Sequence, residues 1–159
     1  MLNLTKNLAA ATLALALATA APALAETVSR DLATEEANRQ LVVDFYNRIF
    51  NDHNLEGGSL DVMADDYIQH NPMVPTGKKA FFDFFSSFFP KHPDAKSRIV
   101  RSAAQGDLVW LHVHAGGKEN GTGGRAIVDI FRVANGKIVE HWDVAQPVPA
   151  ESANENTMF

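Results

Sequence analysis

The sequence predicts an α+β domain in which N-terminal helices pack on one face of a curved antiparallel sheet. Apolar residues recur at helical spacing in the first half of the chain, whereas from residue 95 onward they alternate or run as they do in strands. In addition, Asn135-Gly136 stands between two apolar runs and is typical of a two-residue hairpin turn. These observations favour helices followed by a β-meander.

The first 25 residues predict an export signal that is removed from the working protein. Lys6 precedes an Ala/Leu-rich run over residues 8–20, and Ala23-Leu24-Ala25 supplies the small residues that a signal peptidase reads. We expect cleavage after Ala25 and a periplasmic or secreted location. The apolar run is short for a bilayer span, so a membrane anchor is the weaker interpretation.

The mature chain has room for one domain, which we place at residues 26–145, followed by a tail at 146–159 that we expect to be disordered. The formal net charge of −5 disfavours nucleic acid or an anionic membrane as a partner and leaves a small-molecule ligand open. The chain has no cysteine, which excludes disulfides, thiolate metal ligands and a thiol nucleophile.

Three helices are predicted before the sheet. The first covers residues 34–50, a short second one covers 59–65, and the third covers 78–89 and ends at Pro90. The third helix contains six phenylalanines, more than one helical stripe can hold. Some of them should face the core and the others a ligand cavity or a partner subunit.

The remaining elements are predicted to be extended. A brief segment at 67–72 is stopped by Pro72, and four strands follow at 95–103, 108–115, 125–133 and 137–145.

The turn at Asn135-Gly136 sets the expected register of the last hairpin. With Ala134 opposite Lys137, Asp129 faces Trp142. His141 and Asp143 then lie on the opposite face, and we expect them at a dimer contact or on the surface. This register predicts that Asp129 and His141 do not pair.

Asp129 is the principal functional candidate. An acid in the middle of an apolar strand costs several kcal/mol unless it is paired or protonated. Apolar neighbours would raise its pKa and suit it to remove a proton α to a carbonyl group. The alternative is a structural acid that bonds Arg101, Arg125 or a backbone amide.

Histidines are the other candidate catalytic groups. His112 and His114 alternate with apolar residues on one strand, and we expect them on the concave face with Asp129, because burial of polar groups without a cavity is costly. Together with His70 they could donate hydrogen bonds to a developing enolate. They could instead be polar lining or structural residues, or a His-x-His metal site completed by Asp129 or His70.

Aromatic residues are candidates for substrate binding, although such residues are more often core. The set is Tyr67, Phe84, Phe85, Trp110, Phe131 and Trp142. Both faces of the last hairpin are substantially apolar, and with no helices left to cover the convex face we expect a homodimer there.

Several segments resemble the SnoaL-like proteins of the nuclear transport factor 2 (NTF2)-like superfamily across roughly the whole mature domain. They are Phe-Asn-Asp-His at 50–53, Asp-Asp-Tyr-Ile-Gln-His-Asn-Pro at 65–72, Gly-Asp-Leu-Val at 106–109 with His-Val-His at 112–114, Val-Asp-Ile-Phe-Arg at 128–132 and Gly-Lys-Ile-Val-Glu-His-Trp-Asp at 136–143. The resemblance implies a cone-shaped, frequently dimeric barrel with a pocket between helices and sheet.

The resemblance also implies kinship with polyketide cyclases, which perform cofactor-independent intramolecular aldol condensations with an aspartate as acid/base. The matching position is Asp129. Epoxide hydrolases share the fold, but Ile127 and Val144 stand where their arginine and second aspartate would be. We therefore expect an exported enzyme of aldol or enolisation type, needing no cofactor or metal, that acts on a small apolar carbonyl compound. The alternative is a non-catalytic pocket protein.

Overall fold

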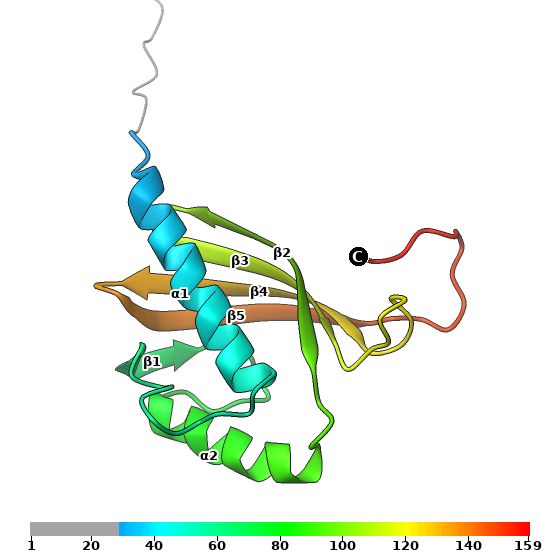
Figure 1. Ribbon diagram of the computed structural model, residues 1–159, viewed down its shortest axis with the longest axis horizontal. Coiled ribbons are helices and arrows are strands. Elements are labelled where there is room, and N and C mark those ends of the chain that lie inside the picture. The colour runs from blue at the N-terminus through cyan, green and yellow to red at the C-terminus, as the bar shows by residue number, and fades with distance from the viewer. Residues whose placement is uncertain (1–28) are drawn as a thin grey trace, which may run out of the picture.

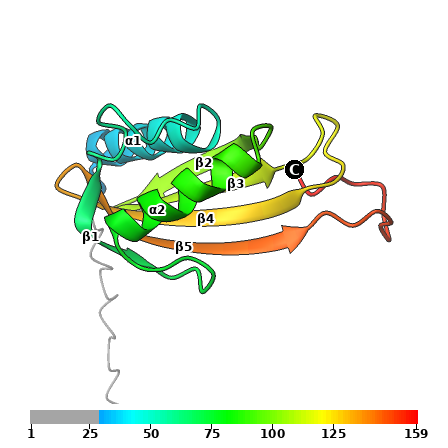
Figure 2. The same cartoon turned by 90° about the horizontal axis from the view of Figure 1, so that it is seen from below.

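The computed structural model describes residues 29–159, and the predicted signal at 1–25 lies outside them. The elements are helix α1 (Leu32–Phe50), strand β1 (Met63–Gln69), helix α2 (Lys78–Phe88), the 3₁₀ turn η1 (Phe89–Lys91), and strands β2 (Ser97–Gln105), β3 (Leu108–Ala115), β4 (Arg125–Ala134) and β5 (Lys137–Pro147). Both helices lie on one side of a curved, unclosed five-stranded sheet (Figures 1 and 2). The predicted α+β class is confirmed.

Helix α1 crosses the concave face of the sheet. It begins at Leu32 because the Asp31 carboxylate accepts hydrogen bonds from the Thr34 backbone N–H, at 3.1 Å, and from the Thr34 hydroxyl, at 2.6 Å. Its buried residues Val42, Phe45, Tyr46 and Ile49 form part of the core. Within residues 29–159, no helix has the length and apolar character needed to cross a membrane.

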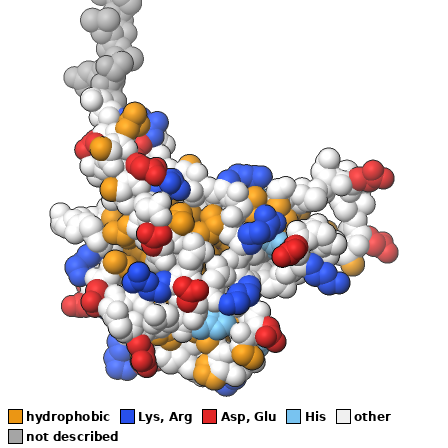
Figure 3. All heavy atoms as spheres, viewed as in Figure 1, with side chains coloured by type: hydrophobic (Ala, Val, Ile, Leu, Met, Phe, Trp, Pro, Cys, Tyr) orange, Lys and Arg blue, Asp and Glu red, His pale blue; other side chains and the backbone are white. Residues whose placement is uncertain are grey.

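Helix α2 carries most of the phenylalanine cluster. It starts after Gly77, whose φ of 100° suits glycine, and Pro90 follows in the 3₁₀ turn that ends it. Phe81 is 4% exposed and belongs to the core, whereas Phe82 and Phe84 are 39% and 37% exposed. The phenylalanines therefore divide as predicted between the core and a cavity, which Phe84, Phe85 and Phe88 line, while Phe82 is exposed. On the face of the molecule that carries the helices, apolar side chains are visible between scattered charged ones (Figure 3).

The strand order is β1-β5-β4-β3-β2. Strands β2 to β5 form the predicted antiparallel meander, but β1 pairs with β5 in parallel, which makes the sheet mixed. The predicted short helix at 59–65 is wrong. Turns lead into β1 at Met63, which pairs with Ile138 at the sheet edge.

A β-bulge in β5 changes the register of the last hairpin. Ala134 pairs with Lys137 as predicted, but the pairing then skips Val139, which has no partner on β4. Every later pair is shifted by one residue, and a shift of one residue turns each side chain to the other face of the sheet.

The bulge brings Asp129 and His141 together. Asp129 faces Asp143 instead of Trp142, and His141 and Asp143 join Asp129 on the helix side of the sheet. Trp142 faces Ile130 and lies on the opposite, convex face. The prediction that Asp129 and His141 cannot pair is therefore wrong, because it assumed an unbroken ladder.

Strand β5 continues to Pro147, two residues beyond the predicted end of the domain at 145. Residues 148–159 form neither helix nor strand, and the ring of Phe159 stacks on that of His114 with a centroid distance of 4.1 Å. The disorder of this tail stays a prediction.

Candidate functional site

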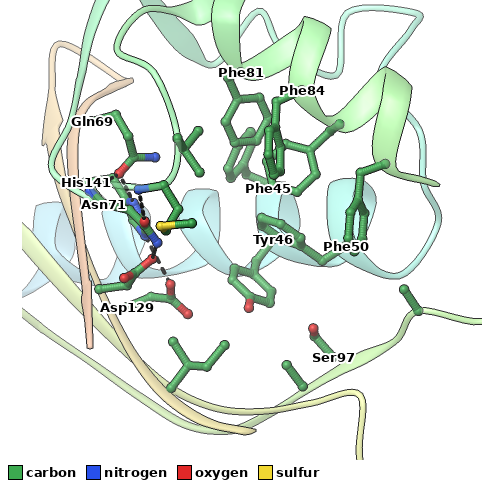
Figure 4. Close-up of a pocket in the computed structure, with 18 of the residues that line it drawn as sticks. Phe45, Tyr46, Phe50, Gln69, Asn71, Phe81, Phe84, Ser97, Asp129 and His141 are labelled. Atoms are coloured by element: carbon green, nitrogen blue, oxygen red, sulfur yellow. Dashed lines mark hydrogen bonds and ion pairs between the residues drawn. The ribbon is translucent and has the colours of Figure 1, made fainter. Parts of the chain in front are cut away.

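A cavity of about 420 Å³ lies between the two helices and the concave face of the sheet. This volume is within the range of small-molecule pockets. Figure 4 shows its two sides, with polar groups on one and aromatic rings on the other. The polar side has Gln69, Asn71, Asp129 and His141, and the aromatic side includes Phe45, Phe50, Phe81 and Phe84. Asp143, Phe85 and Phe88 also line the cavity.

Asp129 lies in the middle of β4 and is only 5% exposed. Its Oδ1 is 3.0 Å from Nε2 of His141. Its Oδ2 is buried and has no hydrogen-bond partner within residues 29–159. A buried oxygen without a partner is uncommon in a folded protein, and a catalytic role is one of the explanations for it.

The hydrogen bonds of Gln69 show which ring nitrogen of His141 carries a proton. Gln69 Oε1 accepts the backbone N–H of Asn71 at 2.9 Å, which identifies that atom as the oxygen. His141 Nδ1 lies 2.9 Å from the same oxygen and must therefore donate its N–H. The contact between His141 Nε2 and Asp129 Oδ1 then needs one further proton, carried by His141 as imidazolium or by Asp129 as carboxylic acid.

The surroundings of Asp129 raise the pKa of its carboxyl group above its usual range. Burial raises the pKa of the carboxyl group, and the hydrogen bond and charge of His141 lower it. The nearby charge of Asp143 raises it again, and the Tyr46 hydroxyl, which approaches the carboxyl group, lowers it. The net direction is upward. Asp129 and His141 thus form a pair that can hold and release one shared proton.

Tyr46 brings a phenol to the same end of the cavity. It is 3% exposed, and its hydroxyl points toward the region between Asp129 and Ser97 (Figure 4). Burial, followed by the charge of Asp129, raises the pKa of this phenol well above its usual value near 10. Tyr46 therefore stays protonated and is a hydrogen-bond donor at neutral pH.

The end of β1 holds the polar groups in place. Gln69 pairs with His141 across the parallel β1–β5 edge, and its Nε2 donates to the Tyr67 hydroxyl at 3.0 Å. Asn71 Nδ2 donates to Asp143 Oδ2 at 2.6 Å. This edge therefore orients both His141 and Asp143.

Of the four predicted catalytic residues, Asp129 lines the cavity and the three histidines do not. His112 and His114 lie on the convex face, because Val109, Leu111 and Val113 of the same strand are fully buried on the helix side. Their predicted concave placement is wrong: the aliphatic residues gain more from burial against the helices.

The three histidines have partners of their own. His112 Nδ1 accepts a hydrogen bond from Arg101 at 2.8 Å, and burial and the Arg101 charge lower its pKa. His114 Nε2 lies 2.9 Å from the Gly123 carbonyl oxygen. His70 turns outward, with its ring stacked on Trp142 at 4.7 Å and Nε2 2.8 Å from Glu140 Oε1.

The predicted aromatic set divides in the same way. Tyr67, Phe84, Phe85 and Phe131 line the cavity, whereas Trp110 and Trp142 lie on the convex face. Sequence reasoning missed Tyr46, Gln69, Asn71, His141 and Asp143. Gln69 and Asn71 lie in a segment that was predicted to be extended but was given no role at the site, and an allowance for a bulge would have identified His141.

One group among the described residues has atoms close enough to hold a metal ion: Asp129, His141 and Asp143, within 4.8 Å of one another. The alternative at His112 and His114 lacks a third ligand among the described residues, because Asp129 is on the other face and His70 does not group with the two histidines. In the Asp129 group, the Nε2 lone pair of His141 already faces Asp129. A metal ion there would displace the shared proton.

A family model described as a SnoaL-like domain matches residues 42–141. A comparison with curated protein sequences gives no significant match. Among solved structures, a SnoaL-like protein of unknown function from Burkholderia thailandensis has a TM-score of 0.59 and 18% identity, covering 70% of this chain and 96% of that one.

Two further structures support the same fold. An NTF2-like protein from Mesorhizobium loti has a TM-score of 0.56 and 19% identity over 70% of this chain and 93% of that one. IdmH from Streptomyces antibioticus, itself only proposed to be a polyketide cyclase, has a TM-score of 0.54 and 20% identity over 68% of this chain and 91% of that one. At these identities the likeness establishes the NTF2-like fold, as the sequence predicts.

Proposed function

Because the chain belongs to the SnoaL-like domain family, we propose that it is a cofactor-independent enzyme that enolises a small, mostly apolar carbonyl compound, as an aldol-type cyclase or an isomerase does. The observation that carries the proposal is the buried Oδ2 of Asp129, which has no hydrogen-bond partner within residues 29–159. The other oxygen of this carboxyl is held by His141. A carboxyl arranged in this way has one oxygen free to exchange a proton with a bound molecule.

Asp129 acts as the base. With the shared proton on His141, Asp129 is a carboxylate, and its Oδ2 takes a proton from the carbon α to the substrate carbonyl. The C–H bond breaks, its electron pair forms the enolate, and negative charge develops on the carbonyl oxygen. In an aldol closure the enolate carbon then attacks a second carbonyl of the same molecule, and Asp129 returns the proton to the alkoxide.

Tyr46 stabilises the enolate. Its hydroxyl lies on the Asp129 side of the cavity (Figure 4), and its raised pKa keeps the proton in place. A preorganised donor aimed at a developing oxyanion is worth about 2.7–4 kcal/mol of barrier in a water-poor site. The aromatic wall supplies that environment and binds the apolar body of the substrate.

Loss of α-deuterium from a simple ketone tests this chemistry without knowledge of the natural substrate. Wild-type protein should accelerate the exchange of α-deuterated 2-tetralone with water, measured by proton NMR. Asp129→Asn should reduce the rate by about a hundredfold to ten-thousandfold, because general base catalysis contributes that much. The matched control is Asp66→Asn, a change at an exposed acid on β1.

The results of the exchange experiment distinguish an enolising enzyme from a non-catalytic ligand-binding protein. Equal exchange by wild type and Asp129→Asn, with both variants folded, refutes the role of Asp129. Unaltered small molecule recovered with the wild-type protein, without exchange of any ketone in a panel, favours the non-catalytic ligand-binding alternative.

We also propose a homodimer formed through the convex face. Val128 and Val144 face each other across β4 and β5 and are 42% and 73% exposed. Both described helices cover the other face (Figure 2). Adjacent exposed valines on an uncovered sheet face support a protein contact there.

A further inference from the structure

The cavity has a second polar region at Lys96 and Arg125, and Arg125 lies four residues before Asp129 on β4. Ser97, Ala115 and Arg125 are direct partners across three neighbouring strands, and all three line the cavity. Lys96 precedes Ser97 and also lines it. This row places two cationic side chains at the end of the cavity where β2 and β4 begin.

Arg125 is available to bind a ligand. Its side chain is exposed at the cavity mouth, and its guanidinium makes no hydrogen bond or ion pair with any residue in the range 29–159. Lys96 has one partner, since its Nζ donates to the backbone carbonyl oxygen of Asn51. The chain has a formal net charge of −5. The two cationic side chains at the cavity mouth are therefore not part of a generally basic protein.

The spacing of the two ends limits the length of the ligand. Arg125 and Asp129 are four residues apart on the same face of β4, which corresponds to about 13 Å along a strand. Ile127 lies between them on this face, and phenylalanines of α2 form the opposite wall. A molecule that reaches both ends therefore has an apolar body of about two fused rings.

We infer that the substrate is an apolar keto acid, with the reacting carbonyl at Asp129 and a carboxylate at the other end bound by Arg125. The inference rests on the proposed function for the position of the carbonyl. Guanidinium and carboxylate form paired hydrogen bonds with charge on both partners, which makes Arg125 a specificity group for the anionic end.

Two naphthols of the same shape test the inference. In 6-hydroxy-2-naphthoate the hydroxyl mimics an enol and the carboxylate stands at the far end. In 6-(hydroxymethyl)-2-naphthol a neutral group replaces the carboxylate. Titration calorimetry on wild type, Arg125→Gln and Arg98→Gln gives the affinities. Arg98 is the matched control, because it is an exposed arginine that pairs with His114 on the convex side of the sheet.

Wild type should bind the naphthoate at least tenfold more tightly than the neutral naphthol. Arg125→Gln should remove this preference and leave the affinity for the neutral naphthol unchanged, while Arg98→Gln changes neither. Equal affinities in wild type, no binding of the naphthoate, or an equal loss in both arginine variants would overturn the inference. Exchange of neutral 2-tetralone tests the proposed function separately, because that ketone has no anionic end.

Discussion

Asp129 is a carboxyl group whose two oxygens have different environments. His141 holds Oδ1, and Gln69 in turn fixes the His141 ring by accepting its Nδ1–H. Oδ2 has no partner within the described chain. Burial of a polar atom without a hydrogen-bond partner destabilises the folded state. Proteins retain such a destabilising arrangement at sites where a reaction uses the group.

The burial of Asp129 makes stability depend on pH. Burial raises the folded-state pKa of Asp129 above the value of about 3.9 expected in the unfolded chain. Between these two values the folded protein binds more protons than the unfolded chain, so stability falls as pH rises through this window. Asp129→Asn keeps the shape of the side chain and does not titrate.

The free energy of unfolding of Asp129→Asn, relative to wild type, should therefore increase as pH rises from about 4 and become constant above the folded-state pKa. Urea denaturation at a series of pH values between about 4 and 8 measures it. A difference that stays constant across this range would contradict the raised pKa.

At the scale of elements, β5 and α2 build the two sides of the cavity. The extra residue Val139 in β5 turns His141 and Asp143 toward Asp129, and the parallel neighbour β1 supplies Gln69 to His141. Helix α2 provides the aromatic wall, with Phe81 anchored against Phe45 and Tyr67 at centroid distances of 6.0 and 6.2 Å.

Two phenylalanines on α2 should differ sharply in their contribution to stability. Phe81→Ala removes a ring that is 4% exposed and should cost about 3–5 kcal/mol, because it leaves a cavity in the core. Phe82→Ala, at a position 39% exposed, is the control on the same helix and should cost less than about 1 kcal/mol. Urea denaturation gives both values, and equal losses would show that α2 does not pack as described.

At the scale of the whole molecule, the sheet has one face covered by helices and one without them (Figure 2). The ring of Phe159 covers part of the second face at His112 and His114, and Val144 remains exposed. A dimer through this face would not cover the cavity, which lies between the helices and the opposite face of the sheet.

Val144→Lys should weaken the proposed dimer at least tenfold, because it places a charge in an apolar contact, a loss of about 1.4 kcal/mol or more. Sedimentation velocity at several concentrations measures this. Leu32→Lys is the control, since Leu32 is 64% exposed at the start of α1. A wild-type monomer, or an unchanged dimer in Val144→Lys, would refute the interface.

Native mass spectrometry of protein taken from its own cell envelope would give the subunit number and the N-terminal residue together. An N-terminus at Glu26 is expected from the predicted signal cleavage. An intact N-terminus at Met1 would contradict export through this signal.

Part of the site could be predicted from residue patterns. Asp129 stood out because charge in an apolar strand is costly, and Tyr67, Phe84, Phe85 and Phe131 were identified as aromatic lining. The histidines were misplaced because strand alternation shows which residues share a face and does not show which face meets the helices. Tyr46 was missed because, on a helix pattern, a pocket residue looks like a core residue.

By itself the sequence determined the α+β class, the approximate limits of α1, α2 and the four antiparallel strands, and the unusual acid at Asp129. These depend on local periodicity and on the energy of burying a charge, which can be evaluated one segment at a time. The tertiary structure decided the partners of Asp129. The bulge at Val139, the parallel pairing of β1 with β5, and the choice of helix-facing side in β3 arise from packing between distant segments, and no local pattern encodes that packing.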